Sequence, residues 1–282
     1  MDPLLRAQKN EATEHLIYRR LAEKTADPHN RKILTRIAQD EARHYQRFKK
    51  ATGQDVAPDM FRVRVYLFLA SLLGLTFALK RMEQGEKLAL VLYRTPAFRP
   101  FSDMLRDEQR HEKEILNMLA EERVSYASAI VLGLNDALVE LSGVLGGLTF
   151  ALGQTKLIAL VGVVTGIAAA LSMGASGYLS TREDHDSTKS PGRSALYTGV
   201  TYLATVAVLV APFLIIAEAL VALGTMLVEM LLVIAFYTFY ITTVKDLPFW
   251  KRFGEMALIS LGIAAISFVI GWSVRAVFGI AV

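Results

Sequence analysis

The sequence predicts an all-α protein in which a charged four-helix bundle is followed by a five-helix transmembrane domain. Three observations support this fold class: an uneven distribution of charge, helical periodicity without strand signals in the first half, and five long apolar stretches in the second. Residues 1–124 carry 23 Lys and Arg and 18 Asp and Glu, whereas residues 125–282 carry only 8 and 9. We therefore expect two domains, residues 1–124 and residues 125–282.

The composition excludes several classes of protein. The chain of 282 residues has no cysteine, which excludes disulfide frameworks, thiolate zinc sites, iron–sulfur clusters and c-type haem attachment. With 53% hydrophobic residues it is not a disordered chain. The net charge of +4 gives no reason to expect a nucleic-acid partner.

Helix-terminating residues divide the charged half into four predicted helices. The first helix ends at Asp27-Pro28, the second at Gly53 and the third at Thr95-Pro96, while Ser102 is placed to cap the fourth. Short links between four helices favour an antiparallel bundle. The predicted helices cover residues 3–25, 29–52, 60–94 and 101–123.

The third predicted helix contains a run, residues 65–79, that is apolar on all faces. This run of 15 residues is short for a membrane span, which needs about 20 residues. A crossing at this point would also separate the third and fourth helices from the first two. We therefore expect a helix that is buried on several sides, at a dimer contact or against the membrane surface.

An internal repeat runs through the four predicted helices. A lone glutamate on one helix is followed by Glu-x-x-His on the next, and this order occurs twice. Because residues three apart share a helix face, each Glu-x-x-His presents a carboxylate and an imidazole to one point. One such motif alone is typical of a solvated face, but the double repeat matches the ligand set of carboxylate-bridged di-iron and di-manganese bundles. The predicted ligands are Glu11, Glu41, His44, Glu86, Glu108 and His111.

Two more carboxylates, Glu14 and Glu83, lie three residues from the lone glutamates on the same helix faces. They are either additional ligands or surface carboxylates, and the spacing alone leaves both interpretations open.

The second half contains five stretches long enough to cross a bilayer, whose hydrocarbon core of about 30 Å needs about 20 helical residues. Their connections carry unequal charge. Arg182, Lys189 and Arg193 follow the second stretch, and Lys245, Lys251 and Arg252 follow the fourth; the loops on the other side contain only Lys156. Basic residues favour the cytoplasmic side. The stretches are residues 126–152, 156–181, 194–217, 219–243 and 252–279.

This topology predicts an integral protein of the plasma membrane with the N-terminal half in the cytoplasm and the C-terminus outside. The first residues lack the apolar run of a secretory signal, in agreement with that orientation.

Polar side chains inside the apolar stretches are candidates for an ion path, because a carboxylate within a membrane is costly. Asp136 follows Asn135 in the first stretch and shares a helix face with Glu140. Met173 offers a soft thioether ligand in the second stretch, and Glu229 lies inside the fourth. For Asp136 a purely structural role, accepting hydrogen bonds from a neighbouring helix, is the alternative.

The segment Asn135-Asp136-Ala137-Leu138, followed by Ser172-Met173 and Tyr178-Leu179-Ser180, resembles the vacuolar iron transporter (VIT/CCC1-like) family. The N-terminal half resembles a rubrerythrin-type ferritin domain, and the combination resembles the membrane-bound ferritin or erythrin–VIT group. This resemblance implies a homodimer that moves Fe²⁺ across the lipid bilayer, with proton antiport as the driving force. It also implies that Asp136 and Met173 line the ion path.

The sequence departs from the family pattern in two places. Many members have glutamate where this chain has Gly177, before Tyr178, and the family's cytoplasmic metal-binding insertion between the second and third spans is missing. We expect the N-terminal bundle to take the place of that insertion. A rubredoxin-like centre is excluded because the chain has no cysteine.

These features together predict a proton-coupled exporter of ferrous iron whose cytoplasmic ferritin-like bundle captures, senses or oxidises the metal at a di-iron site. Manganese is the alternative metal, and ferroxidase activity of the bundle is left open. The main alternative function is a membrane-anchored di-iron oxidase or peroxidase, with the apolar half as an anchor. A third is a manganese or broad divalent-cation transporter with the bundle as a sensor.

Overall fold

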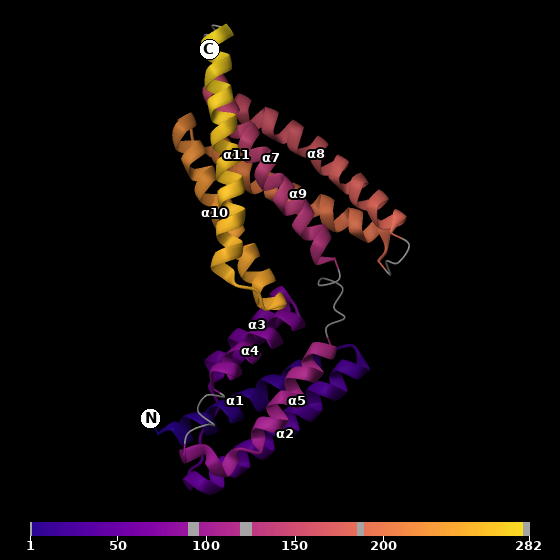
Figure 1. The fold of residues 1–282 in the computed structure, drawn as a ribbon, viewed down its shortest axis with the longest axis vertical. Helices are drawn as coiled ribbons and strands as arrows, with labels where there is room; N and C mark the ends of the chain where they lie inside the picture. The colour runs from indigo at the N-terminus through magenta and orange to yellow at the C-terminus, as the bar shows by residue number, and fades with distance from the viewer. Residues whose placement is uncertain (1, 90–95, 119–125, 185–188, 279–282) are drawn as a thin grey trace. The chain divides into compact units, whose positions relative to one another are not determined.

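The computed structural model describes residues 2–89, 96–118, 126–184 and 189–278 (Figure 1). Within these residues the chain is helical and contains no strand. It divides into two compact units, Met1–Val124 and Ser125–Val282. The division falls where the density of charged side chains changes along the sequence.

The N-terminal unit is a helical bundle. Helix α1 packs along α2 and against α3, and α5 contacts α2 and α4. Asp27 caps α2 by accepting a hydrogen bond from the Asn30 amide, and Gly53 ends the same helix in the left-handed conformation with φ of 66°. The elements are α1 (Pro3–Lys24), α2 (Pro28–Thr52), α3 (Met60–Leu73), α4 (Leu75–Ala89), the 3₁₀ helix η2 (Pro96–Phe101) and α5 (Met104–Asn117).

The prediction of one continuous helix over residues 60–94 was wrong at Gly74. This residue has φ of 98° and ψ of 159°, a backbone conformation open essentially to glycine alone, and it separates α3 from α4. The apolar run is accordingly buried on only one side of the break. Phe68 of α3 is 62% exposed, whereas Phe77 of α4 is fully buried. Residues 90–94 and 119–123 of the predicted helices lie outside the described residues.

Two apolar clusters hold the bundle together. The larger contains Ile17 and Tyr18 of α1, Ile37 of α2, Leu79 of α4 and Ile115 of α5. The smaller joins the end of α2 to η2 and the start of α5, where the rings of Phe48 and Phe101 stack 4.4 Å apart between centroids. The bundle helices are therefore fixed at both ends by burial of apolar side chains.

In the described part of the C-terminal unit, residues 126–184 and 189–278, five helices are long and apolar enough to cross a membrane. Helix α7 ends at Gly153 with φ of 68°, and α9 begins with Pro191 in its first turn. The helices are α7 (Ala127–Leu152), α8 (Thr155–Glu183), α9 (Pro191–Ile215), α10 (Ala219–Lys245) and α11 (Phe249–Phe278).

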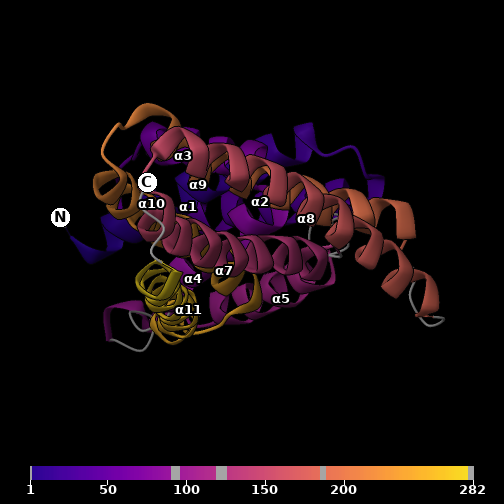
Figure 2. The same cartoon turned by 90° about the horizontal axis from the view of Figure 1, so that it is seen from above.

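Helices α8 and α9 run along each other, and α7 packs against both α9 and α11 (Figures 1 and 2). Glycines allow the closest approaches. A Cβ atom on Gly133 of α7 would lie 2.3 Å from the Thr198 carbonyl oxygen of α9, and one on Gly271 of α11 would lie 2.3 Å from the Gly147 carbonyl oxygen of α7. Small residues at such contacts are typical of helix packing within membranes.

Candidate functional site

Four predicted ligands from three helices meet inside the bundle. Glu11 of α1, Glu41 and His44 of α2, and Glu108 of α5 each offer a ligand atom within 4.8 Å of the others. Glu41 is 1% exposed and His44 is 2% exposed. Carboxylate and imidazole groups at this separation form a set that is able to hold a transition-metal ion.

His111 of α5 completes a second half of the same cluster. One oxygen of Glu41 lies 3.3 Å from His44 Nδ1, and its other oxygen lies 3.2 Å from His111 Nδ1. The two oxygens of Glu108 lie 3.5 Å and 3.7 Å from the same two nitrogens. Each carboxylate therefore spans both imidazoles, as two carboxylates do when they bridge a pair of ions.

The other ring nitrogen of each histidine faces an aspartate on the opposite helix. His44 Nε2 lies 3.2 Å from Asp107 of α5, and His111 Nε2 lies 3.0 Å from Asp40 of α2. Arg110 pairs with both aspartates, at 2.6 Å and 2.9 Å. A carboxylate in this position fixes the orientation and tautomer of an imidazole ligand.

These two aspartates were not among the predicted site residues, although the sequence contains a signal for them. Each directly precedes the glutamate of its repeat, so the full pattern is Asp-Glu-x-Arg-His at residues 40–44 and again at residues 107–111.

The environment raises the pKa values of Glu11 and of both cluster histidines, for different physical reasons. Burial raises the pKa of Glu11 well above its usual range. Burial opposes the charged form of His111, yet the Glu108 and Glu41 carboxylates beside its Nδ1 raise its pKa to about 11. The pKa of His44 is raised in the same way, because the Glu108, Glu11 and Glu41 carboxylates near its Nδ1 outweigh burial. Protons on Glu11 and on the two histidines thus offset the negative charge of the buried carboxylates. The donor set fits metal cations, which replace those protons when they bind.

Two other predicted ligands, Glu83 and Glu14, are not in this cluster. Glu83 of α4 is buried beside Lys80, with Nζ and Oε2 3.0 Å apart. Glu14 of α1 lies 3.8 Å from Arg62 of α3. The side chain of Glu86 lies outside the described residues.

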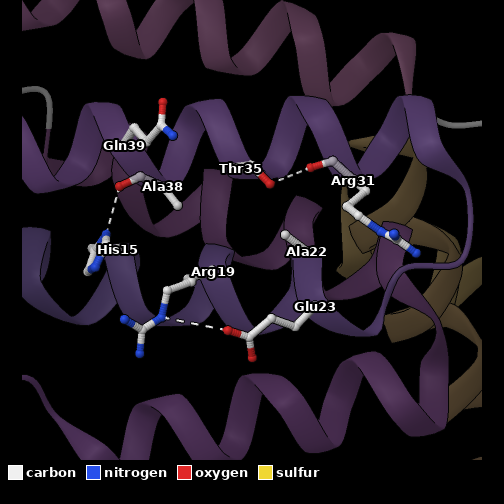
Figure 3. Close-up of a pocket in the computed structure, with 8 residues that line it drawn as sticks. All are labelled: His15, Arg19, Ala22, Glu23, Arg31, Thr35, Ala38 and Gln39. Carbon is white, nitrogen blue, oxygen red and sulfur yellow. Dashed lines mark hydrogen bonds and ion pairs between the residues drawn. The ribbon is translucent and has the colours of Figure 1, made fainter.

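A separate groove of about 320 Å³ lies between α1 and α2 on residues that the cluster does not use (Figure 3). His15 lies in this groove with Nδ1 2.7 Å from the Ala38 carbonyl oxygen. Arg19 points toward Glu23, 3.9 Å away. His15 is therefore a useful comparison for the two cluster histidines.

In the C-terminal unit, Asn135 and Asp136 line a cavity of about 480 Å³ beside α7. Ser128 and Val139 of α7 and Lys245 at the end of α10 line the same cavity. The structure thus places one of the two predicted α7 carboxylates at an open, partly polar surface within a candidate span.

Glu140 lies one helical turn further along α7 and is bonded to a neighbouring helix. Its Oε2 atom accepts a hydrogen bond of 2.7 Å from the hydroxyl of Tyr202, a fully buried residue of α9. Met173 of α8 is half-buried against the apolar core, and Glu229 of α10 is half-buried; neither lines the cavity beside Asp136. Tyr202 was also missed from the sequence, since nothing in the apolar third stretch indicates its partner.

Gly177, where the sequence departs from the pattern of the family it resembles, has a packing role. It is buried, and a Cβ atom there would lie 3.0 Å from the Thr198 hydroxyl oxygen of α9. A larger side chain would push α8 and α9 apart.

Comparison with known families finds a matching family model in each half of the chain. The VIT family model matches residues 127–191, which cover α7 and α8. The rubrerythrin model matches residues 2–119. A search of curated proteins found no match. The chain therefore combines a rubrerythrin-type, ferritin-like helical domain with a VIT-family transmembrane segment in one polypeptide, as in the erythrin–VIT group.

Proposed function

We propose that this protein exports ferrous iron across the plasma membrane in exchange for protons, and that its bundle captures the ion first. The observation that carries the proposal is the buried cluster in which Glu41 and Glu108 each span His44 and His111. Oxygen and imidazole ligands suit Fe²⁺ and Mn²⁺. A rubrerythrin-type domain beside a VIT-family segment supports metal transport or di-iron function in general.

In the bundle, Glu11, Glu41, His44, Glu108 and His111 would hold the metal, with Glu86 supplying the ligand that the repeat assigns to the third predicted helix. A bound pair of iron ions supplies the redox couple for ferroxidase chemistry. Asp40 and Asp107 orient the imidazoles, and the burial of Glu41 and His44 keeps water from the ligand atoms.

In the membrane, we assign the cation path to Asp136 and Asn135 at the cavity and to Glu140 one turn further along α7. Met173 and Glu229 are further positions of the path. The basic connections after α8 and α10 favour a cytoplasmic location for that side of the membrane. Exposed Asn135 and Glu140 on α7 are poorly suited to lipid, which favours a second copy of the chain against this face.

The test is Fe²⁺ flux into proteoliposomes that contain the full-length protein. Asp136→Asn preserves shape but removes the charge, so flux should fall to the level of empty vesicles. Glu255→Gln is the matched control, because Glu255 is exposed and pairs with Arg252 at 3.3 Å. Full flux through the Asp136→Asn variant would remove Asp136 from the path.

The same vesicles separate the rival functions. Peroxide- or oxygen-dependent turnover without any ion flux would favour a membrane-anchored di-iron oxidase. Equal competition by Mn²⁺ against Fe²⁺ would favour a broad divalent-cation transporter with the bundle as its sensor.

A further inference from the structure

The hydrogen bond between Tyr202 and Glu140 joins two helices inside the membrane unit. Tyr202 of α9 is 0% exposed and belongs to the apolar core, whereas Glu140 is exposed on α7. The hydroxyl donates to Oε2 over 2.7 Å. A hydrogen bond to an ionised carboxylate is stronger than one between neutral groups and restricts how its acceptor is oriented.

The helices around this pair are packed so that the phenol has little freedom to move. Thr198 lies one turn before Tyr202 on α9 and is approached from two sides. A Cβ atom on Gly133 of α7 would lie 2.3 Å from its carbonyl oxygen, and one on Gly177 of α8 would lie 3.0 Å from its hydroxyl. Two glycines on neighbouring helices thus let α9 come close, and this packing holds the tyrosine within reach of Glu140.

The two carboxylates of α7 therefore have different surroundings. Asp136 lines the cavity of about 480 Å³, where it is open to small ions. Glu140 does not line that cavity, and one of its oxygens is bonded to Tyr202. Its other oxygen, Oε1, is left as a ligand atom at a defined position one turn from Asp136.

From this geometry we propose that Tyr202 is a positioning residue of the cation path. Its hydroxyl holds Glu140 in one orientation, so that a cation leaving Asp136 meets a preorganised second carboxylate. This role rests on the proposed transport function and assigns to it a residue on α9, outside the helix that carries the carboxylates. The competing explanation is that the bond only satisfies a buried hydroxyl, which would affect folding and not transport.

The test measures the dependence of flux on Fe²⁺ concentration in proteoliposomes with full-length protein. Tyr202→Phe removes the hydroxyl and keeps the ring. Since the loss of one hydrogen bond to a charged group is large enough to change binding by about tenfold, we expect KM to rise by about that factor. Maximal flux per protein should stay within about twofold, because the hydroxyl orients a ligand for binding.

Glu140→Asp is a second, independent variant, because it keeps the charge but withdraws it from the tyrosine. It should raise KM by a similar factor. Adding Tyr202→Phe to Glu140→Asp should then change KM no further, since the two groups act through one hydrogen bond. An additive rise in the double variant would overturn the proposal.

Tyr237→Phe serves as the matched control. It removes the hydroxyl of another largely buried tyrosine of the same unit, on α10, and should leave KM unchanged. An unaltered KM in Tyr202→Phe, with only a lower unfolding temperature, would show a purely structural bond and overturn the proposal while the transport function stands. Wild-type protein that passes no Fe²⁺ would overturn the transport function itself, and this role with it.

Discussion

His44 and His111 each turn one ring nitrogen toward the cluster and the other toward an aspartate on the opposite helix. When Nε2–H donates to the aspartate, the lone pair on Nδ1 is left for a cation. The arrangement is reciprocal, because Asp40 of α2 serves the histidine of α5 and Asp107 of α5 serves the histidine of α2. The repeated sequence motif is therefore matched by a repeated set of contacts between α2 and α5.

We expect Asp40→Asn to weaken Mn²⁺ binding by the bundle by about tenfold or more, the usual effect of losing an outer partner of a histidine ligand. A binding isotherm followed by electron paramagnetic resonance on the full-length protein in detergent would measure this. Asp55→Asn is the control, since Asp55 is exposed and bonds Lys49 at 2.7 Å outside the cluster. Equal affinities of the two variants would contradict the assigned role of Asp40.

Among the elements, the break between α3 and α4 is the feature that periodicity alone does not reveal. Gly74 lies inside the apolar run of residues 65–79, and a single glycine is tolerated within a helix at a cost of about 1 kcal/mol. The break is visible only in the backbone, where φ is 98° and ψ is 159°. This conformation lets Phe77 and Leu79 turn into the core although Phe68 stays exposed.

Replacing the two glycines of this region by alanine should have opposite effects on the unfolding temperature. Gly74→Ala places a Cβ atom in a strained conformation, at a cost of about 1–3 kcal/mol, and should lower it. Gly85 lies within α4, and a Cβ atom added there would meet nothing within 4 Å, so Gly85→Ala should raise the unfolding temperature. The gain in helix propensity stabilises the folded state by up to about 1 kcal/mol. Thermal denaturation followed by fluorescence measures both. A Gly74→Ala variant as stable as wild type would mean that α3 and α4 tolerate a continuous helix.

In the whole molecule, each of the two units contributes its own set of candidate metal-binding groups. The bundle contributes a cluster built from carboxylate and imidazole, and the membrane unit contributes Asp136 at a cavity within its first span. Under the proposed function, the first collects the ion at low concentration and the second moves it.

Loss of the cluster should therefore change the affinity of transport more than its maximum rate. Glu41→Ala removes the carboxylate that spans both histidines, and we expect KM for Fe²⁺ flux to rise by at least about tenfold, since even outer-shell losses cost that much. Flux at saturating Fe²⁺ should persist, because Asp136 and Glu140 are unchanged. His15→Ala, in the groove of Figure 3, is the matched control. Unchanged KM in Glu41→Ala would exclude capture by the bundle.

The sequence by itself determined the helical class, the five apolar spans and the repeated Glu-x-x-His, because composition and helical spacing are local properties of the chain. The contacts of His44 with Asp107, of His111 with Asp40 and of Glu140 with Tyr202 join residues more than sixty positions apart. Such pairs depend on how helices pack and in which register. Only the tertiary structure determined these pairs, because close packing of helices brings distant side chains within hydrogen-bond distance. The spacing of residues along the sequence does not indicate which distant side chains meet.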